Sequence, residues 1–296
     1  MTLLAVPNVS EGRDFAALDR LQESLGDEVL LLDRHTDVDH HRAVFTIAGP
    51  QADLEKALAG LAEAVTREID MSAWEGIHPA IGSLDVCPVV WTAEADRERA
   101  AESALRIAER IATMGIPVFL YGDLAASEER RERAFFRDGG LDGLWRRMTS
   151  GELEADFGPG HPHATAGGWL VTARPPLAAF NIELETDDLA IAKEIAAEIR
   201  ESGGGLPGVR AIGLMLSTGR AQVSMNVHDP VGLPLVRVVE AVREGAARRG
   251  TAPAEAELIG LIPEAALAGY PADVPIRDFD PAFHVIERRV GIFTDS

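Results

Sequence analysis

The sequence predicts an α+β protein built from two ferredoxin-like (βαββαβ) subdomains. The main observation is that one order of elements, strand–helix–strand–strand–helix–strand, occurs twice along the chain. The length of 296 residues suits one large domain or two ordinary domains, and 46% hydrophobic with 26% charged residues is ordinary for a soluble globular protein. We expect subdomains at residues 1–173 and 174–296, with a ligand cleft or tunnel between them, since domain interfaces are preferred places for small-molecule sites.

In the first half, short apolar runs predict strands and amphipathic stretches predict helices. Asp14 is a plausible N-cap, and polar residues 35–42 are expected to form a connection. In chain order the elements are the strand Leu3–Pro7, the helix Asp14–Leu25, the strands Val29–Asp33 and Ala43–Ala48, the helix Gln51–Ile69 and the strand Leu84–Trp91.

Three further elements and a long loop follow this unit. We expect a helix over Ala95–Met114, a strand over Pro117–Tyr121 and a helix over Ser127–Arg137. The glycine-rich stretch Gly151–Gly168 carries histidines and is predicted to be a functional loop that joins the two halves.

The second half repeats the pattern, although it shares little sequence with the first. Its predicted elements are the strand Leu177–Leu184, the helix Asp187–Ser202, the strands Val209–Leu216 and Ala221–Val227, the helix Pro234–Arg248 and the strand Glu257–Ile262. The repeat therefore lies in the order of elements.

Composition argues against several classes of function. The formal net charge of −20 disfavours a general nucleic-acid binder, and an anionic substrate would need a local basic pocket. The single cysteine, Cys87, cannot form an intramolecular disulfide and is expected to be a buried small hydrophobe. We see no secretory signal and no membrane-length apolar run, and we expect a cytoplasmic protein. The glycines of residues 203–208 follow a helix, which is the wrong context for a dinucleotide loop.

His78 is the leading candidate for proton transfer. It precedes Pro79, which restricts its backbone, and its imidazole titrates near neutral pH. The alternative is a turn histidine that caps a strand end.

Other polar residues are candidates for ligand binding. Asn8, Ser10 and Glu11 lie on a strand-to-helix turn, where they either bind a carboxylate or polar heterocycle or simply cap the helix. Arg42 precedes an apolar strand, where its guanidinium could bind a substrate carboxylate.

Histidines and acidic residues are dense in two stretches. The segment 156–163 is either a rigid, histidine-bearing turn or a surface linker. A metal site is a further hypothesis, although no recognised ligand spacing occurs. Its possible ligands are His35, Asp37, Asp39, His41, His161 and His163.

Several motifs, in the same order along nearly the whole chain, resemble those of glutamate formimidoyltransferases. They comprise Val6–Arg13, Leu32–Asp33, Arg42–Thr46, His78–Pro79 with Gly82, Leu84–Pro88, Pro117–Gly122, Asp156–Pro159, Ala179–Ile182, Gln222–Ser224 with Asn226, and Gly260–Pro263.

This resemblance implies a homodimeric transferase of histidine breakdown and one-carbon metabolism. The implied reaction moves a formimino group from N-formimino-L-glutamate to N5 of tetrahydrofolate, the co-substrate, with no metal. The family's catalytic histidine falls on His78, acting as general acid and base. Its folate loop falls on Gly158–Gly167, which includes Pro159, Gly160, His161 and His163.

The chain departs from the family pattern around these residues. Ile77 and Ala80 replace an acidic residue and an arginine, while His35 and His41 replace an aspartate and an asparagine. In the folate loop, aromatic positions fall on Pro162 and Ala166. A non-catalytic or regulatory homologue that binds folate or another anion is therefore the alternative function.

Overall fold

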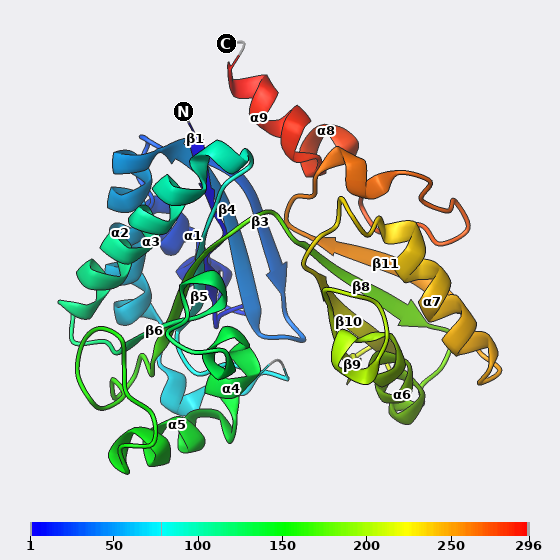
Figure 1. Ribbon diagram of the computed structural model, residues 1–296, viewed down its shortest axis with the longest axis horizontal. Coiled ribbons are helices and arrows are strands. Elements are labelled where there is room, and N and C mark those ends of the chain that lie inside the picture. Colours follow the sequence, from blue (N-terminus) through cyan, green and yellow to red (C-terminus); the bar gives the residue numbers. More distant parts are fainter. Residues whose placement is uncertain (1, 78, 295–296) are drawn as a thin grey trace. The chain divides into compact units, whose positions relative to one another are not determined.

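The computed structural model describes residues 2–77 and 79–294. The chain divides into two compact units, Met1–Arg174 and Pro175–Ser296, each with its own sheet (Figure 1). Both units mix helices and strands, which confirms the predicted α+β class with two subdomains. In the described part of the chain, no helix is both long and apolar enough to cross a membrane.

The sheet of the first unit has the ferredoxin-like order with an extension on one side. Its strands are β1 (Thr2–Ala5), β2 (Asn8–Val9), β3 (Leu30–Asp37), β4 (Arg42–Pro50), β5 (Leu84–Val90), β6 (Val118–Leu120) and β7 (Trp169–Arg174). Both β1 and β2 pair with β4 and β5, so together they act as one interrupted strand. The order across the sheet is β3, β4, β1/β2, β5, β7, β6, with β5, β7 and β6 parallel.

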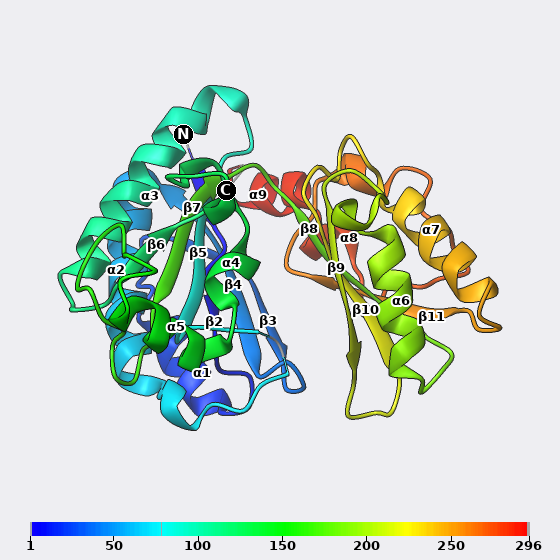
Figure 2. The ribbon, with the colours of Figure 1, turned by 60° about the horizontal axis from the view of Figure 1, so that its bottom comes forward.

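Helices cover both faces of this sheet (Figure 2). The helices α1 (Phe15–Glu23), α2 (Gln51–Glu68) and α3 (Arg97–Ala112) pack apolar side chains into the larger core, which includes Phe45 and Val171. The short helices α4 (Arg133–Arg137) and α5 (Gly140–Thr149) pack on the other face, around Phe119 and Phe136. Asp14 caps α1 as predicted, because its carboxylate accepts a hydrogen bond from the Ala17 amide at 2.9 Å.

The second unit has the predicted βαββαβ order. Its strands β8 (Ala178–Leu184), β9 (Val209–Met215), β10 (Ala221–Val227) and β11 (Pro253–Ile259) form an antiparallel sheet in the order β11, β8, β10, β9. The helices α6 (Leu189–Ile199) and α7 (Leu235–Ala247) bury their apolar faces in one core with it. The short helices α8 (Pro281–His284) and α9 (Ile286–Thr294) follow.

Three of the local predictions for the first half were wrong, and two elements were not predicted. Residues 35–37 continue β3, because an edge strand tolerates polar side chains while β4 supplies its backbone partners. The stretch 127–137 is broken at Glu132, whose backbone is extended between a 3₁₀ turn and α4. The strand β7 and the helix α5 were missed. Since β7 follows the glycine-rich loop, that loop lies inside the first unit and does not join the halves.

Two glycines allow the loop and the entry to β5 to lie backbone against backbone. A side chain on Gly82 would come within 2.2 Å of the Gly168 carbonyl oxygen, and one on Gly167 within 2.2 Å of the Ile81 carbonyl oxygen. The Gly168 amide donates to the Ile81 carbonyl at 2.9 Å, and the Ser83 amide to the Ala166 carbonyl at 3.0 Å. Only glycine fits this contact at either position.

We predict that Gly167→Ala lowers the free energy of unfolding by more than about 2 kcal/mol, since left-handed backbone alone costs an L-residue roughly 1–2 kcal/mol. The φ of Gly167 is +69°. Urea denaturation measures the change. The control is Gly160→Ala in the same loop, where an added side chain meets nothing within 4 Å. Equal stability of the two variants would contradict the proposed backbone contact.

Candidate functional site

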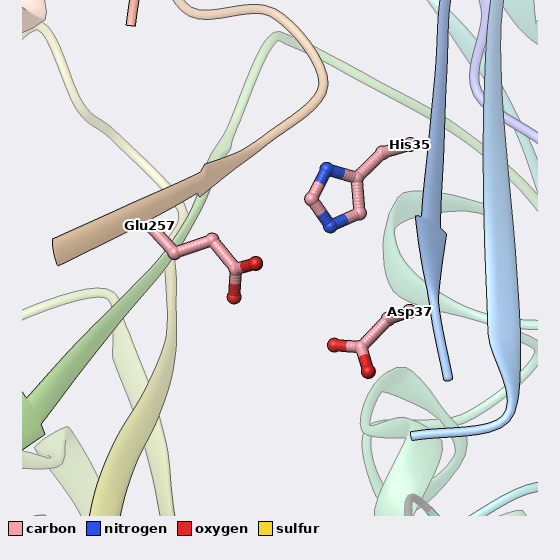
Figure 3. A group of neighbouring side chains, drawn as sticks. All are labelled: His35, Asp37 and Glu257. Carbon is pink, nitrogen blue, oxygen red and sulfur yellow. The ribbon is translucent and has the colours of Figure 1, made fainter. Parts of the chain in front are cut away.

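A polar row of side chains occupies the α4-facing side of the first unit's sheet. Cross-strand partners share a face, and the register pairs His35 with Val44, Asp37 with Arg42, and Asn8 with Val44. The alternate residues, such as Phe45, lie in the larger core on the opposite face. Figure 3 shows His35 and Asp37 projecting from the same side of β3.

The predicted ligand-binding residues of the turn after β2 all form hydrogen bonds within the chain. Asn8 donates through Nδ2 to the Val6 carbonyl at 2.7 Å. Buried Ser10 donates through Oγ to the Gly82 carbonyl at 2.7 Å. The Glu11 carboxylate accepts from the amides of Arg13 and Asp14 at 2.7 and 2.9 Å. These bonds fix the turn and the start of α1, as the capping alternative expects.

His41 connects the β3–β4 hairpin to that turn. Its Nδ1 accepts a hydrogen bond from the Gly12 amide at 3.1 Å and lies 3.4 Å from the Glu11 carboxylate. Its ring stacks on Trp74, with centroids 6.2 Å apart. Burial lowers the pKa of His41, the Glu11 carboxylate raises it and Arg13 lowers it, for a net decrease. An Nδ1 that accepts from an amide must be unprotonated, which agrees with this direction.

Asp37 and His40 close the hairpin between β3 and β4. The Asp37 carboxylate accepts from the His40 amide at 2.9 Å and forms a very short contact with the His40 ring. Burial raises the pKa of Asp37, but the bonds from His40 lower it by more, and the net direction is downward. Asp37 is therefore an ionised group that fixes the turn directly before Arg42.

The pKa of Arg42 responds to a buried carboxylate, Asp85, that the sequence analysis missed. Burial lowers the pKa of Arg42 to about 10, the carboxylate of Asp85 raises it, and Arg137 lowers it. Asp85 is 2% exposed, accepts from the Ile81 amide at 3.2 Å and forms an ion pair with Arg137. Asn8 pairs with Val86 and Val9 with Leu84, which leaves Asp85 as the extra residue of a β-bulge.

The predicted folate loop, Gly158–Gly167, is closed by its own backbone. His163 and Gly167 exchange hydrogen bonds of 2.8 and 2.9 Å, and the His163 ring accepts from the Ala166 amide at 3.1 Å. His161 is exposed, with its Nδ1 3.2 Å from the Pro162 carbonyl oxygen. Ala166 is fully buried in the larger core and offers no stacking surface to a ligand.

The predicted catalytic residue, His78, lies outside the described residues. Cys87 is fully buried as predicted, and burial raises the pKa of its thiol to about 12.

Among the described residues of the first unit, the possible metal ligands of the sequence analysis do not come together in a group of three. Figure 3 also labels Glu257 on β11 in the second unit, whose carboxylate accepts from Asn181 at 3.0 Å.

Comparisons with known proteins give matches along nearly the whole chain. A family model described as the formiminotransferase domain, N-terminal subdomain, matches residues 2–174, and one described as the formiminotransferase domain matches residues 179–272. A glutamate formimidoyltransferase from Streptococcus pyogenes is 37% identical over 96% of this chain and 97% of its own. One from Thermoplasma acidophilum is 35% identical over 88% of each chain. A formimidoyltransferase-cyclodeaminase from Sus scrofa is 32% identical, over 88% of this chain and 50% of its own.

The position of His41 gives a prediction about pH. Because its pKa is lowered in the folded chain, the unfolded chain binds more protons as the pH falls below about 6.5, and the free energy of unfolding decreases there. We expect His41→Asn to lose less stability than the wild type between about pH 7.5 and pH 5.5.

Asparagine is the appropriate replacement, since His41 has a φ of +50° and asparagine tolerates that region. Urea denaturation at the two pH values measures the difference. Identical losses in both proteins would show that His41 does not titrate on unfolding.

Proposed function

The chain belongs to the formiminotransferase domain family, and we propose that it transfers a formimino group from N-formimino-L-glutamate to N5 of tetrahydrofolate. The observation that carries this proposal is the likeness to the streptococcal glutamate formimidoyltransferase, which extends over nearly the full length of both chains. Tetrahydrofolate is a co-substrate in this reaction and leaves as product.

The chemistry of the transfer requires one group that exchanges protons. N5 of the folate attacks the amidine carbon, a tetrahedral intermediate forms, and glutamate leaves as the amine. A base takes the proton from N5, and an acid gives one to the leaving nitrogen; a single imidazole can do both in turn. We assign this role to His78, on the motif that His78 and Pro79 share with the family.

Among the described residues, Arg42 and the turn beside it support a proposal for how the anionic parts of the two substrates bind. Arg42 carries a guanidinium in partly buried surroundings, where a carboxylate forms stronger charge-assisted hydrogen bonds than in water. We propose that Arg42 binds a substrate carboxylate, and that Asn8, Ser10 and Glu11 act by fixing the turn beside it. The loop Gly158–Gly167 is proposed to contact the folate. The homodimer and the cytoplasmic location stay predictions.

We predict that His78→Ala lowers kcat by at least about 100-fold, the smallest effect typical of losing a general acid–base group. Chromatographic detection of released glutamate, with formiminoglutamate and tetrahydrofolate as substrates, measures the rate. His228→Ala, which removes an exposed imidazole of the second unit, is the matched control. Wild-type turnover by His78→Ala would remove this residue from the mechanism.

A non-catalytic binder is the second candidate function. The observation in its favour is that Ala80, at a position where the family has an arginine, is 8% exposed and packs in the larger core. Calorimetry with tetrahydrofolate alongside the transfer assay separates the two functions, because binding without glutamate release supports the binder and turnover rejects it.

A further inference from the structure

The loop Gly158–Gly167 is held at its two ends in different ways. At its far end, it lies backbone against backbone with the entry to β5. At its near end, Phe157 forms a single antiparallel bridge with Val118 of β6, whose amide donates to the Phe157 carbonyl at 2.9 Å. Gly160 and His161 in the middle of the loop are exposed, so the place of the loop is set by its ends.

An aspartate just before the loop strengthens the near end. Backbone amides alternate along a strand, so the Leu120 amide points to the same edge of β6 as the Val118 amide. Since β6 is the last strand of the described sheet, the Asp156 carboxylate supplies the acceptor for the Leu120 amide, at 2.7 Å. The same carboxylate oxygen accepts from Arg130 at 2.5 Å. Asp156 therefore joins the edge of the sheet to an arginine of another element.

Arg130 is anchored by three kinds of contact. It lies in the 3₁₀ turn Glu129–Arg131, which precedes α4. Besides its bond to Asp156, its guanidinium donates to the Glu154 carbonyl at 3.2 Å and lies over the Phe136 ring, 5.4 Å from the ring centre. Phe136 is fully buried. The guanidinium therefore connects the start of the loop to the core beneath α4.

The ion pair of Arg130 with Asp156 is shielded from solvent. Each of the two side chains is 15% exposed. The neighbouring Arg131 instead pairs with Asp123 at 2.9 Å, and those side chains are 46% and 36% exposed. An exposed pair contributes little, whereas removing one partner of a shielded pair leaves the other charge poorly solvated. Arg130 is therefore the arginine of this turn whose loss would release the loop.

We propose that Arg130 is a positioning residue for the transfer reaction, because through Asp156 it keeps the loop Gly158–Gly167 ordered before folate binds. This inference rests on the proposed function, which assigns the folate contact to that loop. A loop that is already ordered loses little further conformational entropy on binding, so its ligand binds more tightly. Arg130 lies outside the motifs shared with the family, whereas Asp156 begins one of them.

Arg130→Gln tests this role in the transfer assay. We expect the KM for tetrahydrofolate to rise at least about fivefold, since ordering even one released residue on binding costs about that factor. The kcat and the KM for formiminoglutamate should stay within about twofold of the wild type, because a contact made equally in the bound and transition states affects KM alone. The matched control, Arg131→Gln, should leave all three constants unchanged.

A double-mutant cycle tests the route through Asp156. Asp156→Asn keeps an oxygen that can accept from the Leu120 amide but removes the charge that Arg130 binds. It should raise the KM for tetrahydrofolate as Arg130→Gln does, and the double variant should be no worse than either single variant, since partners in one contact are not additive. Losses that multiply in the double variant would overturn this route.

Hydrogen exchange without ligand separates positioning from a general loss of stability. In Arg130→Gln, the amides of residues 156–166 should exchange faster than in the wild type, while those of β3 and β4, at the other edge of the sheet, keep their rates. Unchanged exchange in the loop, or faster exchange throughout the first unit, would overturn the positioning role.

The positioning role and the proposed function can fail independently. If the wild type transfers the formimino group but Arg130→Gln keeps the wild-type KM for tetrahydrofolate, the positioning role is wrong and the transferase assignment stands. If the wild type binds tetrahydrofolate in calorimetry without any transfer, and Arg130→Gln weakens that binding at least about fivefold, the positioning of the loop stands and the assignment is wrong.

Discussion

The contact of residues 81–83 with residues 166–168 is the constraint on which the first unit depends. Gly82 and Gly167 lie where a methyl group would overlap a carbonyl oxygen, so the two backbones approach as closely as backbones can. The Ser10 hydroxyl donates a hydrogen bond to the Gly82 carbonyl in the same region. One small region thereby fixes the turn before α1, the entry to β5 and the far end of the glycine-rich loop. The motif that carries His78 leads directly into it.

A second constraint is electrostatic. The net charge of the chain is −20, yet burial and neighbouring arginines lower the pKa of Arg42 and Arg133 in the first unit. The β-bulge at Asp85 provides a buried carboxylate that forms an ion pair with Arg137.

Three histidines of the first unit form contacts that fix its turns. His41 and His163 each use Nδ1 to accept backbone amide hydrogens, as the side-chain oxygen of an asparagine or aspartate commonly does. The ring of His40 instead forms a short contact with the Asp37 carboxylate. In this unit, these three histidines fix tight turns, and the polar segment that suggested a metal centre is half strand and half hairpin.

The sequence alone determined the repeated βαββαβ order, since periods of two and of 3.6 residues are local and survive in any environment. It also indicated the family, the cap at Asp14 and the inaccessibility of Cys87. Tertiary structure decided what depends on distant residues. The strand character of residues 35–37 comes from pairing with β4, and the place of Asp85 comes from an irregular register with β2. The ion pair of Arg137 with Asp85 required the packing of α4 against the sheet, because no local pattern specifies which distant residues meet.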